Sequence, residues 1–233
     1  MKIWFFLVIL FLSQPFFAQE LMGPEVLDKA IAFHDPNGAW PSFVGTLNVK
    51  METPNGSDRH SAVHIDFPHS KFSVDVSKDE DAYSYSIAKD NCAITLNGST
   101  TISNEDLEKF QLSCDRGKMY RNYYTYLYGL PMKLKDAGTQ IHDRVVKTTF
   151  KGKTYLKVKV TYDAEVGDDI WYFYFDPETY AMEVYQFYHE ESKNDGEYIL
   201  LSGMEEINGV KMPKTRKWYY NKDDKFLGVD ILN

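Results

Sequence analysis

The amino-acid sequence predicts a mainly β protein of the α+β class, with about 10–12 antiparallel strands. Three observations support this class. Apolar and polar residues alternate in short segments along most of the chain, turn residues (Gly, Asn, Asp and Pro) separate the segments, and 15% of the residues are aromatic, which suits half-buried pleated surfaces. Only two substantial stretches show helical spacing instead.

The amino terminus has the pattern of a cleaved export signal. One lysine precedes an apolar run over residues 3–12, and Ala18 offers a small residue before a cut. The alternative is a membrane anchor, but a spanning helix needs about 20 apolar residues. We therefore predict a signal peptide over residues 1–18, a single domain over residues 19–233 and no transmembrane anchor in the mature chain.

Composition argues against some classes of partner. Lys and Arg number 26 against 34 Asp and Glu, so the formal net charge is −8. No run of Lys and Arg interrupts this acidic balance, and we therefore predict no nucleic acid binding. A chain of this length buries enough surface to fold without a metal, and we predict no cofactor.

The first part of the chain predicts a short helix followed by five strands. Pro24 suits a first helical turn, and apolar residues continue at helical spacing to about His34. Period-two alternation then takes over, which predicts an antiparallel sheet with one solvent-exposed face. The alternating segments are 43–51, 63–67, 72–76, 83–87 and 92–96.

The middle of the chain changes to helical spacing. Ser103 with Asp106 forms a weak capping box. A longer helix is predicted from about Asp115 to Tyr128, because Gly129 and a proline then stop it. This helix has to pack on something, and the predicted sheet is the available partner. Its apolar and aromatic stripe consists of Met119, Tyr120, Tyr123, Tyr124 and Leu127.

Strands resume after Gly138. Residues 145–150 and 155–162 predict a hairpin, because a Lys-Gly-Lys turn separates them. The segment 170–175 is apolar or aromatic on both faces, so we expect both faces to be covered. The remaining predicted strands are 182–189, 197–207, 215–220 and 226–232.

Two cysteines, Cys92 and Cys114, remain after the predicted signal. In an oxidising compartment a disulfide between them is the favoured interpretation. The alternative is two unpaired cysteines in a core, because spacing alone does not establish geometry. They are too few and too far apart for a redox or zinc motif.

The carboxy-terminal half resembles a known superfamily. A strand ending in Asp176-Pro177-Glu178-Thr179 is followed by two strands and by Asn208-Gly209-Val210-Lys211-Met212-Pro213 before the last hairpin. This order resembles the outer-membrane lipoprotein carriers (the LolA/LolB-like superfamily), and the whole mature chain is similar to an uncharacterised secreted family of Gram-negative bacteria. The resemblance implies an incompletely closed antiparallel β-barrel whose concave apolar face is covered by helices. It also implies acyl chains held between sheet and helices, although this chain lacks the amino-terminal lipidation cysteine of the membrane-attached receptors.

Motifs for catalysis are mostly absent from the sequence. It contains no G-x-S-x-G elbow, no phosphate-binding Gly loop and no H-E-x-x-H pair. His60 and His64 share one face of a predicted strand and, with Asp58 or Asp66, would offer metal ligands. The alternative is two solvated histidines on a polar face, and we predict neither a metal site nor an enzyme.

Large aromatic and apolar residues are the candidate walls of a ligand cavity. They come from the predicted middle helix and from two predicted strands. The alternative is plain core packing, because aromatic rings fill a gap as readily as they line it. The candidates are Met119, Tyr123, Leu127, Trp171, Phe173, Phe175 and Trp218.

Three functions are compatible with this pattern. The first is an exported protein, periplasmic or extracellular, that binds or carries a lipid or another hydrophobic small molecule. The second is an envelope structural or protein-interaction module with a filled core and no ligand. The third is a hydrolase with an unfamiliar site. A cavity beneath the helices would favour the first, and its absence the second.

Overall fold

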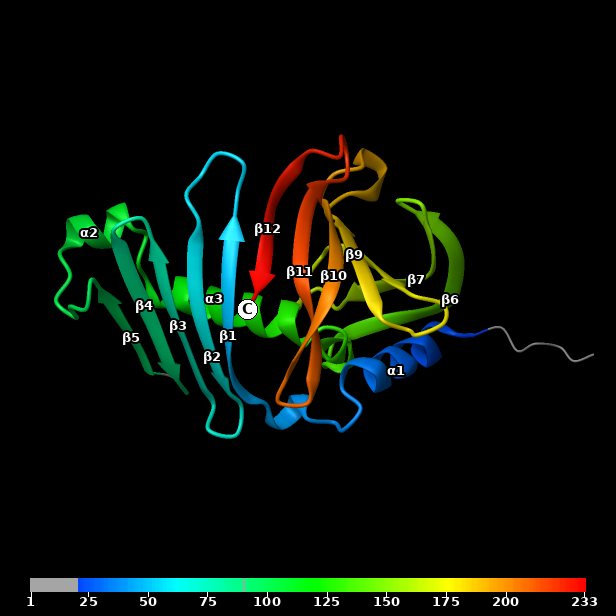
Figure 1. Cartoon of the computed structure of the whole chain (residues 1–233), viewed down its shortest axis with the longest axis horizontal. Helices are drawn as coiled ribbons and strands as arrows, with labels where there is room; N and C mark the ends of the chain where they lie inside the picture. The colour runs from blue at the N-terminus through cyan, green and yellow to red at the C-terminus, as the bar shows by residue number, and fades with distance from the viewer. Residues whose placement is uncertain (1–20, 90) are drawn as a thin grey trace, which may run out of the picture.

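The computed structural model describes residues 21–89 and 91–233, and its strands form one antiparallel sheet. The sheet has 12 strands in the order β5-β4-β3-β2-β1-β12-β11-β10-β9-β8-β7-β6. It curves strongly but does not close, since β5 and β6 remain edges (Figure 1). The prediction of a mainly β, incompletely closed barrel with helices packed on the sheet is therefore confirmed.

Residues 1–18, the predicted signal peptide, lie outside the described residues. Within the described residues, no helix is both long and apolar enough to cross a membrane. The division of the chain into a signal and a single domain stays a prediction.

The first five strands follow one another as a meander. Each overlaps one of the five alternating segments, because period-two alternation places every second side chain against the core. The strands are β1 (Val44–Glu52), β2 (Arg59–Asp66), β3 (Lys71–Lys78), β4 (Asp81–Ala88) and β5 (Asn91–Leu96).

The last seven strands form a second meander whose final strand pairs with β1, so the two halves share one sheet. β6 begins six residues before its predicted start, because a bulge between Ile141 and Val145 breaks the alternation. β11 begins at Val210 and includes Pro213, which precedes the part of β11 that pairs with β12 and so removes no bond to that strand. The strands are β6 (Thr139–Phe150), β7 (Lys153–Tyr162), β8 (Ile170–Phe175), β9 (Met182–Tyr188), β10 (Glu197–Ile207), β11 (Val210–Tyr220) and β12 (Phe226–Leu232).

Helix α3 crosses the concave face of the sheet, on the far side of β1–β4 in Figure 1. It spans Cys114–Gly129, as predicted within one residue at each end, and the Ser113 side chain caps it by accepting from the Arg116 N–H at 3.1 Å. The short helix α2 (Asn104–Lys109) precedes it, capped by Ser103 as the capping box indicated. Residues 21–89 and 91–233 also contain three short 3-10 helices: η1 (Trp40–Ser42), η2 (Met132–Lys135) and η3 (Glu191–Lys193).

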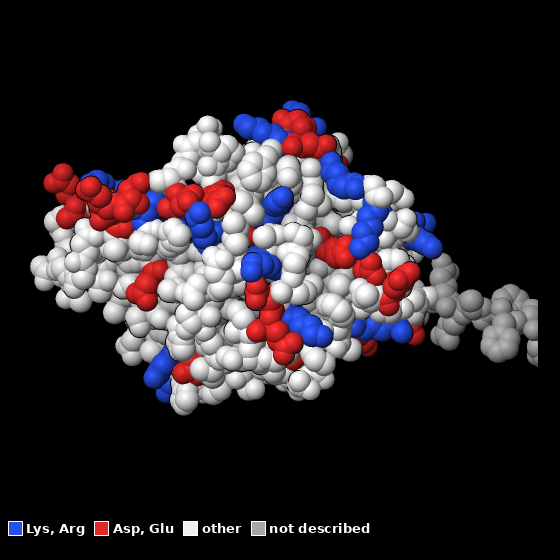
Figure 2. All heavy atoms as spheres, viewed as in Figure 1, with Lys and Arg blue, Asp and Glu red and all other residues white. Residues whose placement is uncertain are grey.

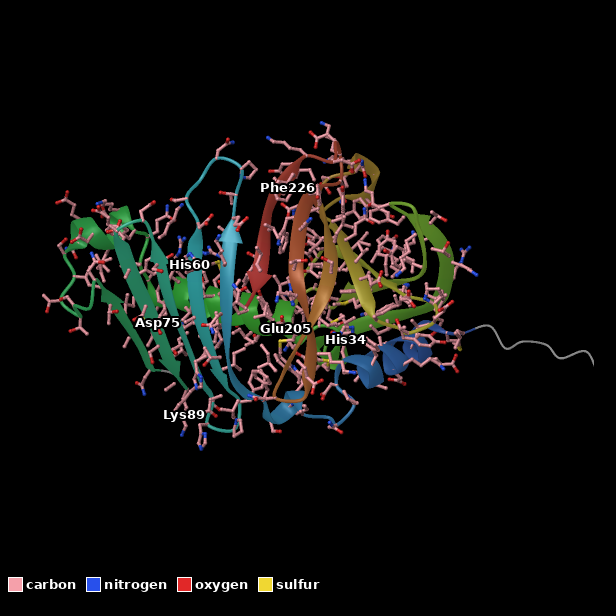
Figure 3. All side chains as sticks on the ribbon, viewed as in Figure 1. His34, His60, Asp75, Lys89, Glu205 and Phe226 are labelled. Carbon is pink, nitrogen blue, oxygen red and sulfur yellow. A yellow bond between two sulfur atoms is a disulfide. The ribbon has the colours of Figure 1, made fainter. Side chains whose placement is uncertain are left out.

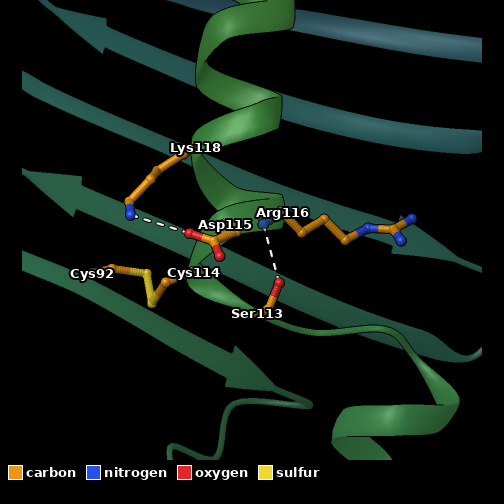
Figure 4. The surroundings of a disulfide bond; sticks show 6 residues. All are labelled: Cys92, Ser113, Cys114, Asp115, Arg116 and Lys118. Carbon is orange, nitrogen blue, oxygen red and sulfur yellow. Dashed lines mark hydrogen bonds and ion pairs between the residues drawn. A yellow bond between two sulfur atoms is a disulfide. The ribbon is translucent and has the colours of Figure 1, made fainter.

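A disulfide ties the start of α3 to the edge of the sheet (Figure 4). Cys114 is the first residue of α3 and Cys92 lies in β5. The predicted bond is therefore confirmed, and the alternative of two unpaired cysteines is excluded. For a sequence separation of 22 residues, loop entropy alone gives a stabilisation of about 3 kcal/mol.

Helix α1 (Gly23–His34) closes the other end of the molecule, where it packs against β6, β7 and β11. Its last residue, His34, is fully buried and is marked in Figure 3. The Met182 N–H donates to His34 Nε2 at 2.9 Å, and His34 Nδ1 donates to the Lys211 carbonyl at 2.8 Å. These two bonds need the neutral imidazole, and burial lowers the pKa of His34 to about 4.

The buried His34 predicts a loss of stability in mild acid. Unfolding returns the histidine to its ordinary pKa of 6.5, so the unfolded chain binds the additional proton. The contribution of the neutral His34 to the free energy of unfolding is fully present above pH 6.5. It decreases by on the order of 3 kcal/mol as the pH falls towards 4. Denaturant unfolding of the native chain and of His34→Gln across this range measures it, because the amide of Gln keeps a donor and an acceptor without titrating. Equal pH dependence of the two proteins would contradict the assignment.

Candidate ligand-binding site

The space between α3 and the first half of the sheet is filled with side chains. Most inward residues of β1–β4 are buried, and Tyr120 and Tyr124 of α3 lie on them. Close packing of this kind leaves no room for a guest, except for a hollow of about 280 Å³ between Arg121 and Thr125 of α3 and the adjoining ends of β2 and β3. The residues at this interface include Leu47, Val63, Val74, Tyr85, Tyr120 and Tyr124.

A glycine sets the distance between α3 and this part of the sheet. Gly117 is buried, and a Cβ atom built on it would lie 2.8 Å from Cδ1 of the Tyr85 ring. Tyr85 is itself fully buried, so its ring has no free space to move into. The absence of a side chain at 117 therefore lets the first half of α3 lie directly on β4.

Two hollows remain where α3 passes the second half of the sheet. The first, which we call the β8 hollow, has a volume of about 460 Å³ and lies between α3, η2 and strands β6–β8. The second, which we call the β12 hollow, has a volume of about 240 Å³ and lies between α3 and strands β1 and β10–β12. Tyr123 of α3 lines both of them.

The predicted cavity residues lie in three different places: the hollows, the core and the exposed surface. Tyr123, Trp171 and Trp218 line the hollows: Trp171 the β8 hollow, Trp218 the β12 hollow, and Tyr123 both. Leu127, Phe173 and Phe175 are buried in the core, where they support these walls from behind. Met119 is 50% exposed and lines neither hollow.

Aromatic rings connect α3 to the sheet beside the hollows. The Tyr123 ring stacks on Trp218 with centroids 6.5 Å apart, and Tyr126 meets the edge of Trp171 at 5.7 Å. Phe187 of β9 stacks on Trp171 at 4.8 Å. Tyr126 and Phe187 were not among the predicted residues, although Phe187 alternates in register within a predicted strand. Such ring pairs contribute about 0.5–1.5 kcal/mol each beyond burial.

Three charged residues and one methionine lie in a row across four neighbouring strands of the sheet. Strand register places Arg59, Met51, Asp230 and Arg216 side by side on β2, β1, β12 and β11. Asp230 is buried and accepts from Trp218 Nε1 at 3.2 Å and from the Tyr123 hydroxyl at 3.4 Å. Burial raises the pKa of Asp230, although the two arginines act in the opposite direction.

Arg216 links this row to the end of α3. It is almost completely buried, and its guanidinium lies 3.8 Å from the centre of the Tyr128 ring. It donates to the Pro213 carbonyl at 2.9 Å and to the Leu127 carbonyl at 3.4 Å. The second half of α3 is therefore held to β11 and β12 by two long hydrogen bonds, one from Arg216 and one to Asp230.

A third hollow of about 480 Å³ lies on the outer face of β1–β5. Its lining residues include His60 and Asp75, which are marked in Figure 3. Figure 2 shows few charged side chains on this face of the molecule. This third hollow is slightly larger than the β8 hollow, and its described lining has one aromatic residue, Tyr83, beside short polar side chains such as Ser77 and Ser84.

The structure does not bring the histidines of β2 together with further ligands. His64 contacts the Thr46 hydroxyl at 3.1 Å, and Asp66 contacts His69. Asp58 pairs with Lys50 at 2.8 Å. Among the described residues, no group of three or more His, Cys, Asp or Glu side chains could hold a metal ion.

Close packing of α3 on β4 predicts an unusual response to Gly117→Ala. In an ordinary helix this change stabilises by about 1 kcal/mol. Here the added methyl group meets the buried Tyr85 ring, and we expect the free energy of unfolding to fall by about 1–2 kcal/mol. The matched control is the same change in a Tyr85→Leu background, where it should be neutral or stabilising. Urea unfolding of the four proteins tests this, and stabilisation in the presence of Tyr85 would contradict the packing.

The architecture is shared with solved structures of lipoprotein-sorting proteins. A LolA superfamily protein from Nitrosomonas europaea aligns with a TM-score of 0.53 at 10% sequence identity, over 92% of this chain and 92% of that chain. A structure described as an outer membrane lipoprotein-sorting protein domain, from Vibrio parahaemolyticus, aligns with a TM-score of 0.50 at 11% identity, over 91% and 90%. The likeness shows a LolA-like fold. No curated protein matches the sequence. The family model that matches residues 1–232 is described as a family of unknown function, and the chain belongs to this family, DUF6503.

Proposed function

We propose that this chain is an exported envelope protein that binds or carries a lipid or another hydrophobic molecule between α3 and the sheet. One observation supports this above the others: α3 covers the second half of the concave face incompletely. It leaves two hollows with aromatic walls that meet at Tyr123. Aromatic side chains together with placed polar groups are typical of small-molecule sites, and the β8 hollow also has polar lining residues such as Asn122 and Lys133.

The compartment is part of the same proposal. The disulfide between Cys92 and Cys114 is typical of proteins that fold in an oxidising environment. The chain also shares its fold with a protein described as an outer membrane lipoprotein-sorting domain. Together with the amino-terminal pattern, these observations favour the periplasm or the cell exterior, and no enzymatic activity is proposed.

The way in which α3 is attached determines how a larger ligand would be admitted. The first half of α3 is fixed by the disulfide and by the contact of Gly117 with Tyr85. The second half is held by aromatic contacts, by a hydrogen bond between the Tyr126 and Tyr162 hydroxyls, and by two hydrogen bonds of 3.4 Å that are weak because of their length. We therefore expect the second half to move away from the sheet and to join the hollows into one cavity.

A filled core supports the second candidate, an envelope interaction module without a ligand. Leu127, Phe173 and Phe175 are packed in the core, and the hollows are small beside those needed for several acyl chains. The two functions differ in one property, because only a carrier binds an apolar molecule in a saturable way.

Binding of N-phenyl-1-naphthylamine, whose emission rises in apolar surroundings, tests the proposal. We expect saturable binding to the native chain. Ala137→Trp places a large side chain in the β8 hollow and should weaken binding by about tenfold or more, a change of about 1.4 kcal/mol. The control, Ala62→Trp, fills the hollow on the outer face and should leave binding unchanged.

Extraction of the protein from its native envelope, followed by mass spectrometry, provides an independent measurement. A co-purifying lipid in stoichiometric amount is the expected result. Absence of both a lipid and saturable dye binding would reject the carrier function and favour the interaction module.

A further inference from the structure

The β12 hollow has acidic groups in an otherwise apolar and aromatic wall. Met51, the strand partner of Asp230, forms an apolar part of the wall, and the remaining lining includes Trp218 and Tyr123. Two carboxyl groups face the same space, Glu197 of β10 and Asp230 of β12. Among its described lining residues there is no Lys, Arg or His.

Glu197 stands on the inward face of β10. Strand alternation places it on the same face as Ile199 and Leu201, which are buried in the core. It is half-buried, and within the described part of the chain its carboxylate takes part in no hydrogen bond or ion pair. Burial raises the pKa of Glu197. Apart from the Coulombic influence of His189, which acts to lower this pKa, the carboxylate has no direct counter-charge among the described residues.

The neighbouring cations are turned towards other groups. Arg216 lies over the Tyr128 ring and donates to backbone carbonyls. Arg59 lies 5.9 Å from the centre of the Tyr120 ring. His189, next to Phe187, contacts Asp169 at 2.7 Å. A molecule in the β12 hollow would therefore meet the two carboxyl groups before it met any positive side chain.

Aromatic faces complete the surroundings that a cation requires. The rings of Tyr123 and Trp218 are stacked at 18° to each other, and both donate a hydrogen bond to Asp230. Together they form an aromatic wall beside the carboxyl groups. Aromatic faces and carboxylates together attract organic ammonium groups, through the ring quadrupole and through charge.

We propose that the β12 hollow selects ligands with a cationic head, namely an organic ammonium group on an apolar body. The ammonium group lies between Glu197 and Asp230 against Trp218, and the apolar body extends along Met51 and Tyr123. This inference rests on the proposed function, since it names the class of hydrophobic ligand. The volume of about 240 Å³ suits a single chain or a small ring system.

Three probes with the same tail and different heads test the inference: decylamine, decanol and decanoate at neutral pH. Trp218 lies in the hollow, so quenching of its emission reports binding there in a Trp171→Phe background, where the buried Trp40 is the other tryptophan of residues 21–233 and gives a constant signal. We expect decylamine to bind at least about tenfold more tightly than decanol, and decanoate to bind most weakly. This order would follow from the two carboxyl groups.

Substitutions that each remove one negative charge test whether the preference for decylamine arises in the β12 hollow. Glu197→Gln should reduce the advantage of decylamine over decanol by at least about threefold, because Glu197 has no partner whose loss would disturb the fold. Glu206→Gln is the matched control: it removes the same charge from an exposed site near the other end of β10 and should change nothing.

The outcomes separate this inference from the proposed function. Equal binding of decylamine and decanol would overturn the cationic preference and retain a general hydrophobic carrier. Tighter binding of decanoate would also overturn it and would point to Arg59 and Arg216. No binding of any probe would overturn both the inference and the proposed function.

Discussion

The apolar concave face of the sheet has to be covered, and helix α3 provides most of that cover. Pairing of β12 with β1 joins two meanders into one sheet, so the inward residues of both halves form a single surface. Exposure of that surface to water would cost about 25 cal/mol for each Å². The way in which α3 covers this surface determines where the disulfide and the two hollows lie.

The cover is asymmetric, and the asymmetry links the fold to function. At its start α3 is bonded to the edge strand β5 and touches Tyr85 through a glycine. Towards its end α3 packs closely again through Gly129 on Trp40, but its side chains do not fill the space above β8 and β12. An apolar ligand that entered the two hollows would favour a state in which this part of α3 has moved and the hollows are joined.

Alternation in the sequence was sufficient to predict the strands, because most of them have one buried face. It failed at the start of β6, where a bulge shifts the register, and at Pro213, which looked like a strand boundary but lies inside β11. The disulfide was predicted from the export signal, and α3 was predicted from the helical spacing of its apolar residues. The buried pair Arg216 and Asp230 was missed, since charged residues on strands usually face water. Their period-two relation to Trp218 and to Leu232 would have placed them on the inward face. Which aromatic rings line a hollow and which fill the core depends on the curvature of the sheet, and no local pattern records that curvature.

Hydrogen exchange of the backbone amides of α3 tests most directly whether this helix is a movable cover. We predict that residues 123–128 exchange through an opening with a clearly smaller free energy than the amides of β1–β4, and that a bound apolar probe slows this exchange. Exchange of residues 123–128 only at the free energy of global unfolding, with no response to the probe, would contradict the account, because α3 would then be a permanent part of the core.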